Sequence, residues 1–206
     1  MSLPDFERAK QYALDRLKRE LDPALSYHSL AHTRDDVLPA TERLAVMEHV
    51  DEESLLLLRT AACYHDIGFV EQRHEHESAG AVIARAALPQ FGYQPDQIEA
   101  ICGMIMATRL PQSPHTRLEA ILADADLDSL GRDDFLPRSL ALRDELAAFG
   151  AAAGEEAWYA RQLEFLQTHR FFTPAARALR DAQKRRNIAT VGALLAACRS
   201  HEGRLR

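Results

Sequence analysis

The sequence lacks the features that mark membrane, secreted and organelle-imported proteins. No window approaches the ~18 consecutive apolar residues of a membrane span. The N-terminus has no apolar run of the signal-peptide type, and its acidic residues argue against a transit peptide. Cysteine is scarce: Cys63, Cys102 and Cys198 are odd in number and each lies in an apolar stretch, which favours buried free thiols. Together these absences predict a cytoplasmic protein.

Basic residues are fewer than acidic ones, and sequence patterns typical of β-strands are almost absent. The 25 Lys and Arg residues are outnumbered by 31 Asp and Glu, and the net charge of −6 argues against general nucleic-acid binding. There is no sustained alternation of β-branched residues and no Asn-Gly or Asp-Gly hairpin signal. With 47% hydrophobic and 27% charged residues, the composition is that of an ordinary soluble globular protein.

What the sequence contains instead is a helical period along most of its length. A run of four leucines at 55–58, followed by small apolar residues, predicts a buried helix. Ser2-Leu3-Pro4 has the form of an N-cap followed by proline in the first turn. No polar linker divides the 206 residues, so we expect one all-α domain. The predicted helices cover residues 4–20, 29–49, 52–65, 76–88, 95–107, 117–130, 132–149, 154–169 and 174–199.

The second half of the chain carries aromatic residues at helical spacing and no cluster of metal-ligand type. Trp158, Tyr159, Phe165 and the Phe171-Phe172 pair are therefore interpreted as core. This apolar stripe either closes one side of a pocket or forms the face of a homodimer, and the pattern allows both.

Histidine is the residue that stands out, with nine in the chain and most of them between positions 28 and 76. His28 and His32 are four residues apart, so they share a helix face if the helix begins that early. His65 and Asp66 are adjacent and would diverge by about 100° in the middle of a helix. They can reach one cation only at a helix end, where Gly68 places them.

The ordered motifs resemble the HD-domain superfamily of metal-dependent phosphohydrolases. Tyr27-His28-x-x-x-His32-Thr33 resembles the first motif, and Ala61-Ala62-x-x-His65-Asp66-Ile67-Gly68 resembles the doublet that names the fold. Ala123-Asp124-Ala125-Asp126-Leu127-Asp128-Ser129-Leu130-Gly131 resembles the last motif. The resemblance implies a helical bundle with a metal-site core at about 28–135 and additional C-terminal helices at about 136–206.

The same resemblance implies the ligand set. It assigns His32, His65, Asp66 and one late aspartate to a divalent metal ion. Asp126 is preferred because Ala125-Asp126 and the residues after it are most similar to the family's motif, and Asp124 is the second choice. Mn, Fe, Zn, Co, Ni and Mg all remain candidates for the metal.

The number of metal ions expected depends on whether the sequence offers additional histidine ligands. His76 is one candidate for an extra ligand, but residues 104–109, where a two-metal member would carry another, contain none. We therefore expect one tightly bound metal. His28 is left open as a ligand, an outer donor or a helix cap.

The implied chemistry is hydrolysis of a phosphate ester or anhydride of a small nucleotide or related metabolite. A divalent cation activates water and polarises a phosphoryl oxygen, and Asp66 could orient the water through its second oxygen. His76 or Glu77 is the predicted general acid or base. Arg73 and Arg109 are the predicted phosphate-binding residues, because guanidinium groups bind phosphate with two hydrogen bonds.

Several alternatives are carried with this prediction. Lys184-Arg185-Arg186 could bind phosphate if the last helix folds back over the pocket, but it is better interpreted as a solvated helix face. A di-iron oxygenase of the same fold would need two metals. A non-catalytic nucleotide-binding module would not need the complete ligand set.

Overall fold

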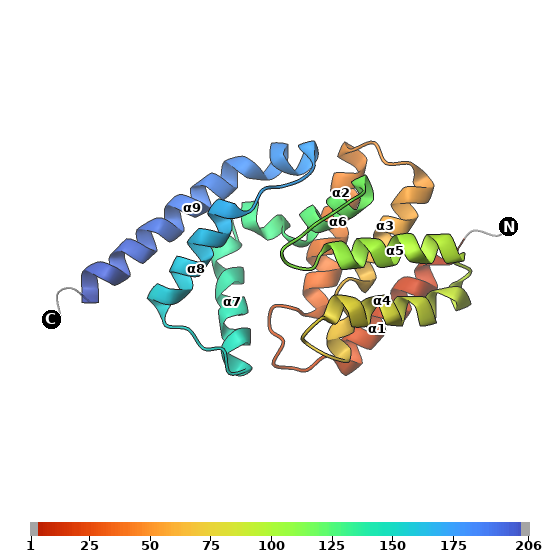
Figure 1. The fold of residues 1–206 in the computed structure, drawn as a ribbon, viewed down its shortest axis with the longest axis horizontal. Helices are drawn as coiled ribbons and strands as arrows, with labels where there is room; N and C mark the ends of the chain where they lie inside the picture. The colour runs from red at the N-terminus through yellow and green to blue at the C-terminus, as the bar shows by residue number, and fades with distance from the viewer. Residues whose placement is uncertain (1–3, 203–206) are drawn as a thin grey trace.

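The computed structural model describes residues 4–202, and in that range it contains nine α-helices and no strand (Figure 1). The prediction of an all-α fold is therefore confirmed. The helices are α1 (Phe6–Glu20), α2 (Leu38–Met47), α3 (Glu52–Tyr64), α4 (His76–Ala87), α5 (Pro95–Ala107), α6 (Arg117–Asp126), α7 (Phe135–Ala148), α8 (Glu155–Thr168) and α9 (Pro174–Glu202). None of them is long and apolar enough to cross a membrane.

The first helix begins later than the sequence predicts. α1 starts at Phe6 rather than at residue 4, because the Asp5 side chain accepts a hydrogen bond from the Arg8 backbone N–H and caps the helix. Ser2 and Leu3 lie outside the described residues.

Two other predicted helices are each divided in the structure. The predicted helix 29–49 contains a π-helical segment, His32–Val37, that leads into α2. The predicted helix 117–130 ends at Asp126 and is followed by a 3₁₀ turn, Asp128–Gly131. Wider helical turns of the π type often occur at functional sites, and this one begins on a residue predicted as a metal ligand.

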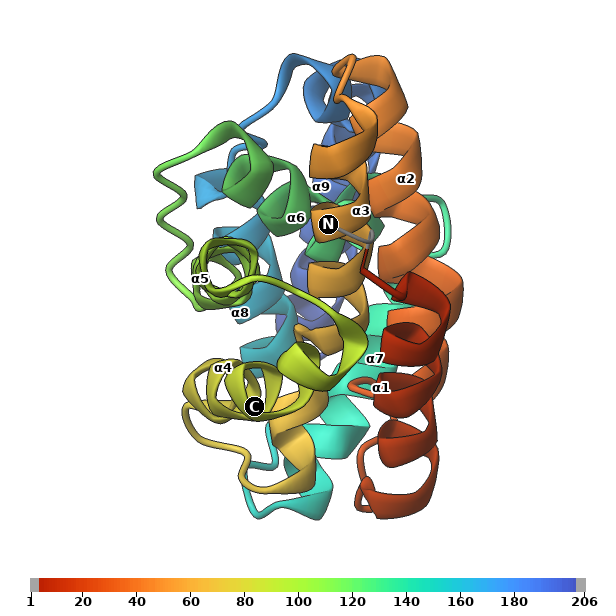
Figure 2. The same ribbon diagram turned by 90° about the vertical axis from the view of Figure 1, so that its right-hand side faces the viewer.

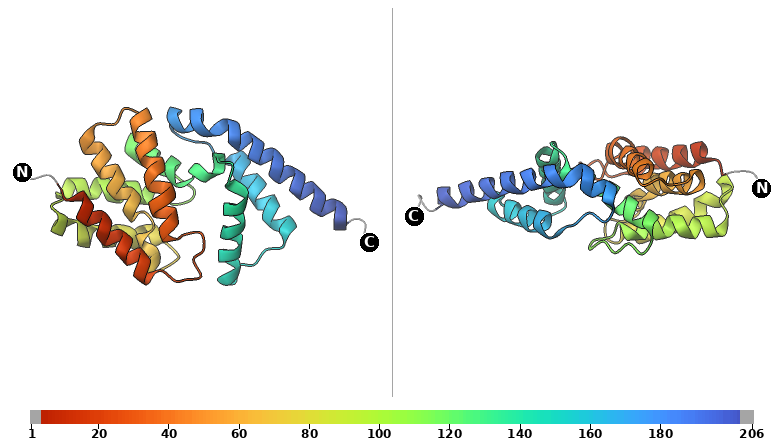
Figure 3. Two further views of the ribbon diagram at one scale, coloured as in Figure 1. Left: turned by 180° about the vertical axis from the view of Figure 1, so that it is seen from behind. Right: turned by 90° about the horizontal axis from the view of Figure 1, so that it is seen from above.

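The helices form two groups placed side by side. Helices α1–α6 lie together at one end of the molecule and α7–α9 at the other (Figures 1 and 3). Within the first group, α5 packs against both α4 and α6 (Figure 2). Buried apolar side chains of both groups, from Phe6 to Leu195, belong to one connected cluster.

An ion-pair cluster joins α9 to the first group of helices. Asp128, only 3% exposed, accepts two hydrogen bonds from Arg180 of α9, at 2.6 and 2.7 Å, and one from Arg43 of α2 at 3.2 Å. Gly131 lies so close to the Arg180 backbone that a Cβ atom there would overlap it. These contacts therefore hold the N-terminal part of α9 against the turn that follows α6.

The cysteines are free, as expected, but they are not equally buried. Cys63 and Cys102 are buried, whereas Cys198 is half-buried on α9. The expectation of burial is thus wrong for Cys198, because its neighbours along this part of α9, residues 196, 197, 199 and 200, are all exposed.

Candidate metal centre

The end of α3 presents His65 and Asp66 side by side. α3 ends at Tyr64, and Asp66 leaves the helical conformation at φ −102° and ψ 4°. His65 Nδ1 donates a hydrogen bond to the Ala62 carbonyl oxygen at 2.8 Å, which leaves the Nε2 lone pair free for a cation. A Cβ atom on Gly68 would overlap the backbone of His76, so only glycine lets this turn pack against the start of α4.

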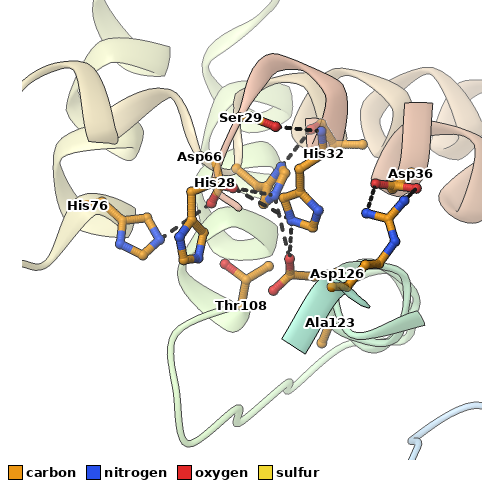
Figure 4. Close-up of polar contacts among 12 residues, drawn as sticks. His28, Ser29, His32, Asp36, Asp66, His76, Thr108, Ala123 and Asp126 are labelled. Carbon is orange, nitrogen blue, oxygen red and sulfur yellow. Dashed lines mark hydrogen bonds and ion pairs between the residues drawn. The ribbon is translucent and has the colours of Figure 1, made fainter. Parts of the chain in front are cut away.

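His32 and Asp126 complete a compact group with this pair. His32 Nε2 lies 3.7 Å from Asp66 Oδ2 and 3.3 Å from Asp126 Oδ1, while His65 Nε2 lies 3.5 Å from Asp126 Oδ1. One ligand atom from each of His32, His65 and Asp66 falls within 4.8 Å of the others. Figure 4 shows the side chains of His32, Asp66 and Asp126 converging from separate elements.

Asp124 has a different position from Asp126. Its carboxylate is fully buried and accepts hydrogen bonds from the Phe172 N–H at 2.8 Å and from the Thr173 N–H and hydroxyl at 2.8 and 2.7 Å. Asp124 thus holds the segment before α9. The structure brings Asp126, and not Asp124, to the histidines.

Two buried atoms of the cluster lack hydrogen-bond partners, and both point to a cation. His65 Nε2 and Asp66 Oδ2 are buried and make no hydrogen bond, although they lie 3.2 Å apart. Buried polar atoms without partners are costly, and a cation would satisfy both at once. Two imidazoles and two carboxylates are a donor set that suits Mn, Fe, Co, Ni or Zn. The residues present therefore fit a divalent metal ion.

The charges of the cluster are strongly coupled. Burial disfavours a charged His65, but the Asp66 and Asp126 carboxylates outweigh it and raise the pKa of His65 to about 9. Burial likewise opposes ionisation of Asp66, and His65 and His76 overcome it and hold the pKa of Asp66 well below its usual value. A divalent cation would supply the same compensating charge and leave the imidazoles neutral as ligands.

His76 and Glu77 lie beside the cluster, as the sequence predicts. His76 opens α4, and its Nε2 lies 3.5 Å from both Asp66 Oδ1 and Glu77 Oε1. The Phe69 ring stacks on His76 at 3.9 Å between ring centres and on His28 at 4.5 Å, and the two histidine rings lie 6.1 Å apart. The ring of Phe69 therefore fixes the orientation of both histidines.

Glu145 is a site residue that the sequence analysis missed. It lies on α7, is 2% exposed, and its Oε1 lies 2.6 Å from His28 Nδ1. Its Oε2 accepts hydrogen bonds from the Tyr27 and His28 backbone N–H groups at 2.8 and 3.0 Å. The carboxylate selects the His28 tautomer with a proton on Nδ1, which leaves Nε2 available. An acidic residue on a helix with polar neighbours gives no sequence signal for such a role.

The cluster opens into a cavity of about 450 Å³ between the two groups of helices. Arg73 and Arg109, the two predicted phosphate-binding residues, both line this cavity. Arg73 stacks on the Phe149 ring at 3.6 Å, and Arg109 pairs with Glu75 at 3.0 Å. Arg138 of α7 also lines the cavity, where it is paired with carboxylates of Asp36 and Asp134.

The Lys184–Arg186 run agrees only in part with its interpretation as a solvated helix face. Lys184 is 5% exposed and donates hydrogen bonds to the His169 carbonyl oxygen at 2.6 Å and Nδ1 at 2.9 Å. The interpretation as a solvated face is wrong for Lys184 and correct for Arg185 and Arg186, which are exposed. Burial and the charge of Lys184 lower the pKa of His169 to about 4.

The aromatic stripe of the second half divides between core and cavity. Trp158 and Phe171 are buried, as the periodicity predicts. Phe165 of α8 is half-buried and lines the cavity, so part of the stripe closes one side of the pocket.

Comparison with known proteins agrees with this geometry. The HD domain model matches residues 27–129, half of the 206-residue chain. A predicted HD superfamily hydrolase from an uncultured Thermotogales bacterium is similar in structure, with a TM-score of 0.64, 21% identity, and coverage of 94% of this chain and 93% of that one. YpgQ of Bacillus subtilis, solved in complex with ADP, has a TM-score of 0.62, 17% identity, and coverage of 90% and 95%. No curated protein matches the sequence significantly.

The matched segment carries His32, His65, Asp66 and Asp126 in the order that the sequence motifs predict. The chain belongs to the HD-domain family.

Proposed function

We propose that this protein is a metal-dependent phosphohydrolase that cleaves a phosphate ester or anhydride of a small molecule. The observation that carries the proposal is the pair of buried, unpartnered ligand atoms, His65 Nε2 and Asp66 Oδ2, beside a cavity of about 450 Å³. In a purely structural cluster, buried polar atoms are normally satisfied by hydrogen bonds inside the protein.

One divalent metal ion would be held by His32, His65, Asp66 and Asp126. When bound, such an ion supplies an activated water at neutral pH and polarises a phosphoryl oxygen. Asp66 has a second carboxylate oxygen, Oδ1, 3.5 Å from His76 Nε2, which suits it to orient a water molecule near the cluster.

His28 is suited to donate a proton to the leaving oxygen. Its Nδ1 is fixed by Glu145 at 2.6 Å, so Nε2 is the atom left to exchange a proton with a ligand in the cavity that His28 lines. Glu145 acts as a positioning residue, because a carboxylate behind an imidazole fixes the tautomer and favours its charged form. His76 and Glu77 are the second candidates for proton transfer, since His76 Nε2 lies 3.5 Å from Asp66 Oδ1 and from Glu77 Oε1.

The substrate carries phosphate that contacts Arg73. Within the described residues the Arg73 guanidinium stacks on Phe149 and pairs with no carboxylate, and its Nε atom is buried without a partner. Arg109 is 48% exposed and paired with Glu75, so it would have to leave that partner to bind phosphate. A nucleotide is one candidate substrate, since the structurally similar YpgQ was solved with ADP.

The test is a screen of phosphate esters and anhydrides against protein reconstituted with each candidate metal. Hydrolysis should disappear on chelation and in His65→Ala, whereas His115→Ala, which alters an exposed histidine that does not line the cavity, should retain it. Absence of hydrolysis by the intact, metal-loaded protein would contradict the proposal. Two irons per chain would indicate oxygenase chemistry instead, and nucleotide binding that survives His65→Ala without any hydrolysis would indicate a binding module.

A further inference from the structure

Part of the lining of the cavity forms an apolar wall. Leu142 and Leu146 of α7, Phe165 of α8 and Leu127 after α6 all line it, and each is half-buried. When a ligand covers apolar side chains that are partly exposed in a cavity, the binding free energy becomes more favourable by about 25 cal/mol for each Å² of apolar surface removed from water. The C-terminal helices thus offer a surface that favours an apolar group in the ligand.

The polar side chains on this wall have few hydrogen bonds to offer. The Ser139 hydroxyl accepts a hydrogen bond from Trp158 Nε1 at 3.1 Å, and the Thr108 hydroxyl donates to the Ile105 carbonyl oxygen at 2.8 Å. Gln162 lines the cavity and makes no hydrogen bond to the described residues. A nucleobase edge is normally bound by several directional groups, and α7 and α8 contribute one free amide to the lining, that of Gln162.

The cavity has few cationic side chains that are free to neutralise the charge of a phosphate group. Arg138 is already bound by two carboxylates and Arg109 by one, so Arg73 is the unpaired guanidinium among the described lining residues. The lining also carries the carboxylates of Glu75 and Glu77 beyond the two in the cluster. A divalent ion and one arginine balance a single phosphate group far better than the ~4 negative charges of a triphosphate.

From this apolar wall and the single unpaired arginine, we infer that the substrate is the monophosphate ester of a mainly apolar alcohol. The inference rests on the proposed function and narrows it: the phosphate binds at the cluster and Arg73, and the alcohol part covers Leu142, Leu146 and Phe165. Alkyl and aryl phosphates share this chemistry.

Substrate preference tests the inference in the metal-loaded protein. Hexyl phosphate and glycerol 3-phosphate have leaving alcohols of similar reactivity, so their kcat/KM ratio reports contact with the wall. We expect hexyl phosphate to be preferred at least about tenfold, and AMP to be preferred over ATP. Equal rates for the two alkyl esters, or a preference for ATP, would overturn the inference and leave the proposed function standing.

Binding of phosphonates, which cannot be hydrolysed, separates the two proposals. Hexylphosphonate should bind more tightly than methylphosphonate in calorimetry. In Leu142→Ala and Leu146→Ala this advantage should fall about 4- to 15-fold, from the loss of one or two methylene contacts. Leu136→Ala is the matched control, since Leu136 is a half-buried leucine of α7 outside the cavity lining.

Each combined outcome has a defined meaning. Selective binding of hexylphosphonate without hydrolysis of any ester would support the inferred ligand class and contradict catalysis. No binding of either phosphonate and no hydrolysis would overturn both proposals. An advantage of hexylphosphonate that is unchanged in Leu142→Ala and Leu146→Ala would overturn the assignment of the wall.

Discussion

The two aspartates of α6, Asp124 and Asp126, offer a direct test of how this site is built. Substitution of each by asparagine keeps the size of the side chain and removes one charge. We expect Asp126→Asn to lose metal and retain stability, and Asp124→Asn to retain metal and lose stability.

The magnitudes follow from the contacts of each carboxylate. Asp124 is fully buried and accepts hydrogen bonds from three donors on Phe172 and Thr173. An asparagine there turns an N–H group toward at least one of these donors, and an unsatisfied buried donor costs about 1–3 kcal/mol. Asp126 is 17% exposed at its side chain and has histidines as its neighbours. Its loss should weaken metal binding by at least about 100-fold, because even outer-shell substitutions cost 10- to 100-fold.

Metal content after dialysis against a metal buffer measures the first effect, and urea unfolding of the chelated proteins measures the second. Chelation matters because bound metal itself stabilises the folded state. The reasoning is refuted if Asp124→Asn loses the metal at unchanged unfolding free energy, or if Asp126→Asn keeps wild-type affinity.

Three further predictions follow from other contacts. Gly68→Ala should cost more than ~3 kcal/mol in urea unfolding, because its Cβ would overlap backbone, whereas Gly80→Ala, with its nearest contact at 3.4 Å, should fold normally. Glu145→Gln should lower kcat at least about tenfold with metal content unchanged, because His28 loses the charge behind its ring; equal kcat would contradict this role. His169, with a pKa of about 4, stays neutral when the unfolded chain gains a proton below pH 6.5, so stability falls from pH 6.5 toward 4. His169→Gln should reduce that fall, as urea unfolding at pH 7 and 5 would show.

Local rules were enough to predict the helix end at which His65 and Asp66 lie. The adjacency of His65 and Asp66, read with Gly68, requires a helix end, and the structure ends α3 at Tyr64. The predicted helix 95–107 coincides with α5, because a Gln94 capping box and Pro95 define its start within the local sequence.

Residues that depend on distant partners were not predictable. Glu145 and His28 are 117 positions apart, and no sequence pattern at either position predicts their contact. Asp124 and Asp126 both fit the motif, and the choice between them depends on where residues 172 and 173 pass the helix. The π-helical segment that begins at His32 likewise reflects tertiary packing, since hydrophobic periodicity cannot distinguish one wide turn inside a helix.

The cavity between the two groups of helices has a consequence for how this protein can diversify. The residues suited to hold a metal come from the segment that matches the HD domain, whereas the apolar wall comes largely from α7 and α8 beyond it. Substitutions in the wall can therefore alter which molecules are admitted without disturbing the ligand atoms. Glu145 is the exception, because it lies on α7 yet fixes His28. Any exchange of the C-terminal helices for those of another protein would have to preserve this one carboxylate.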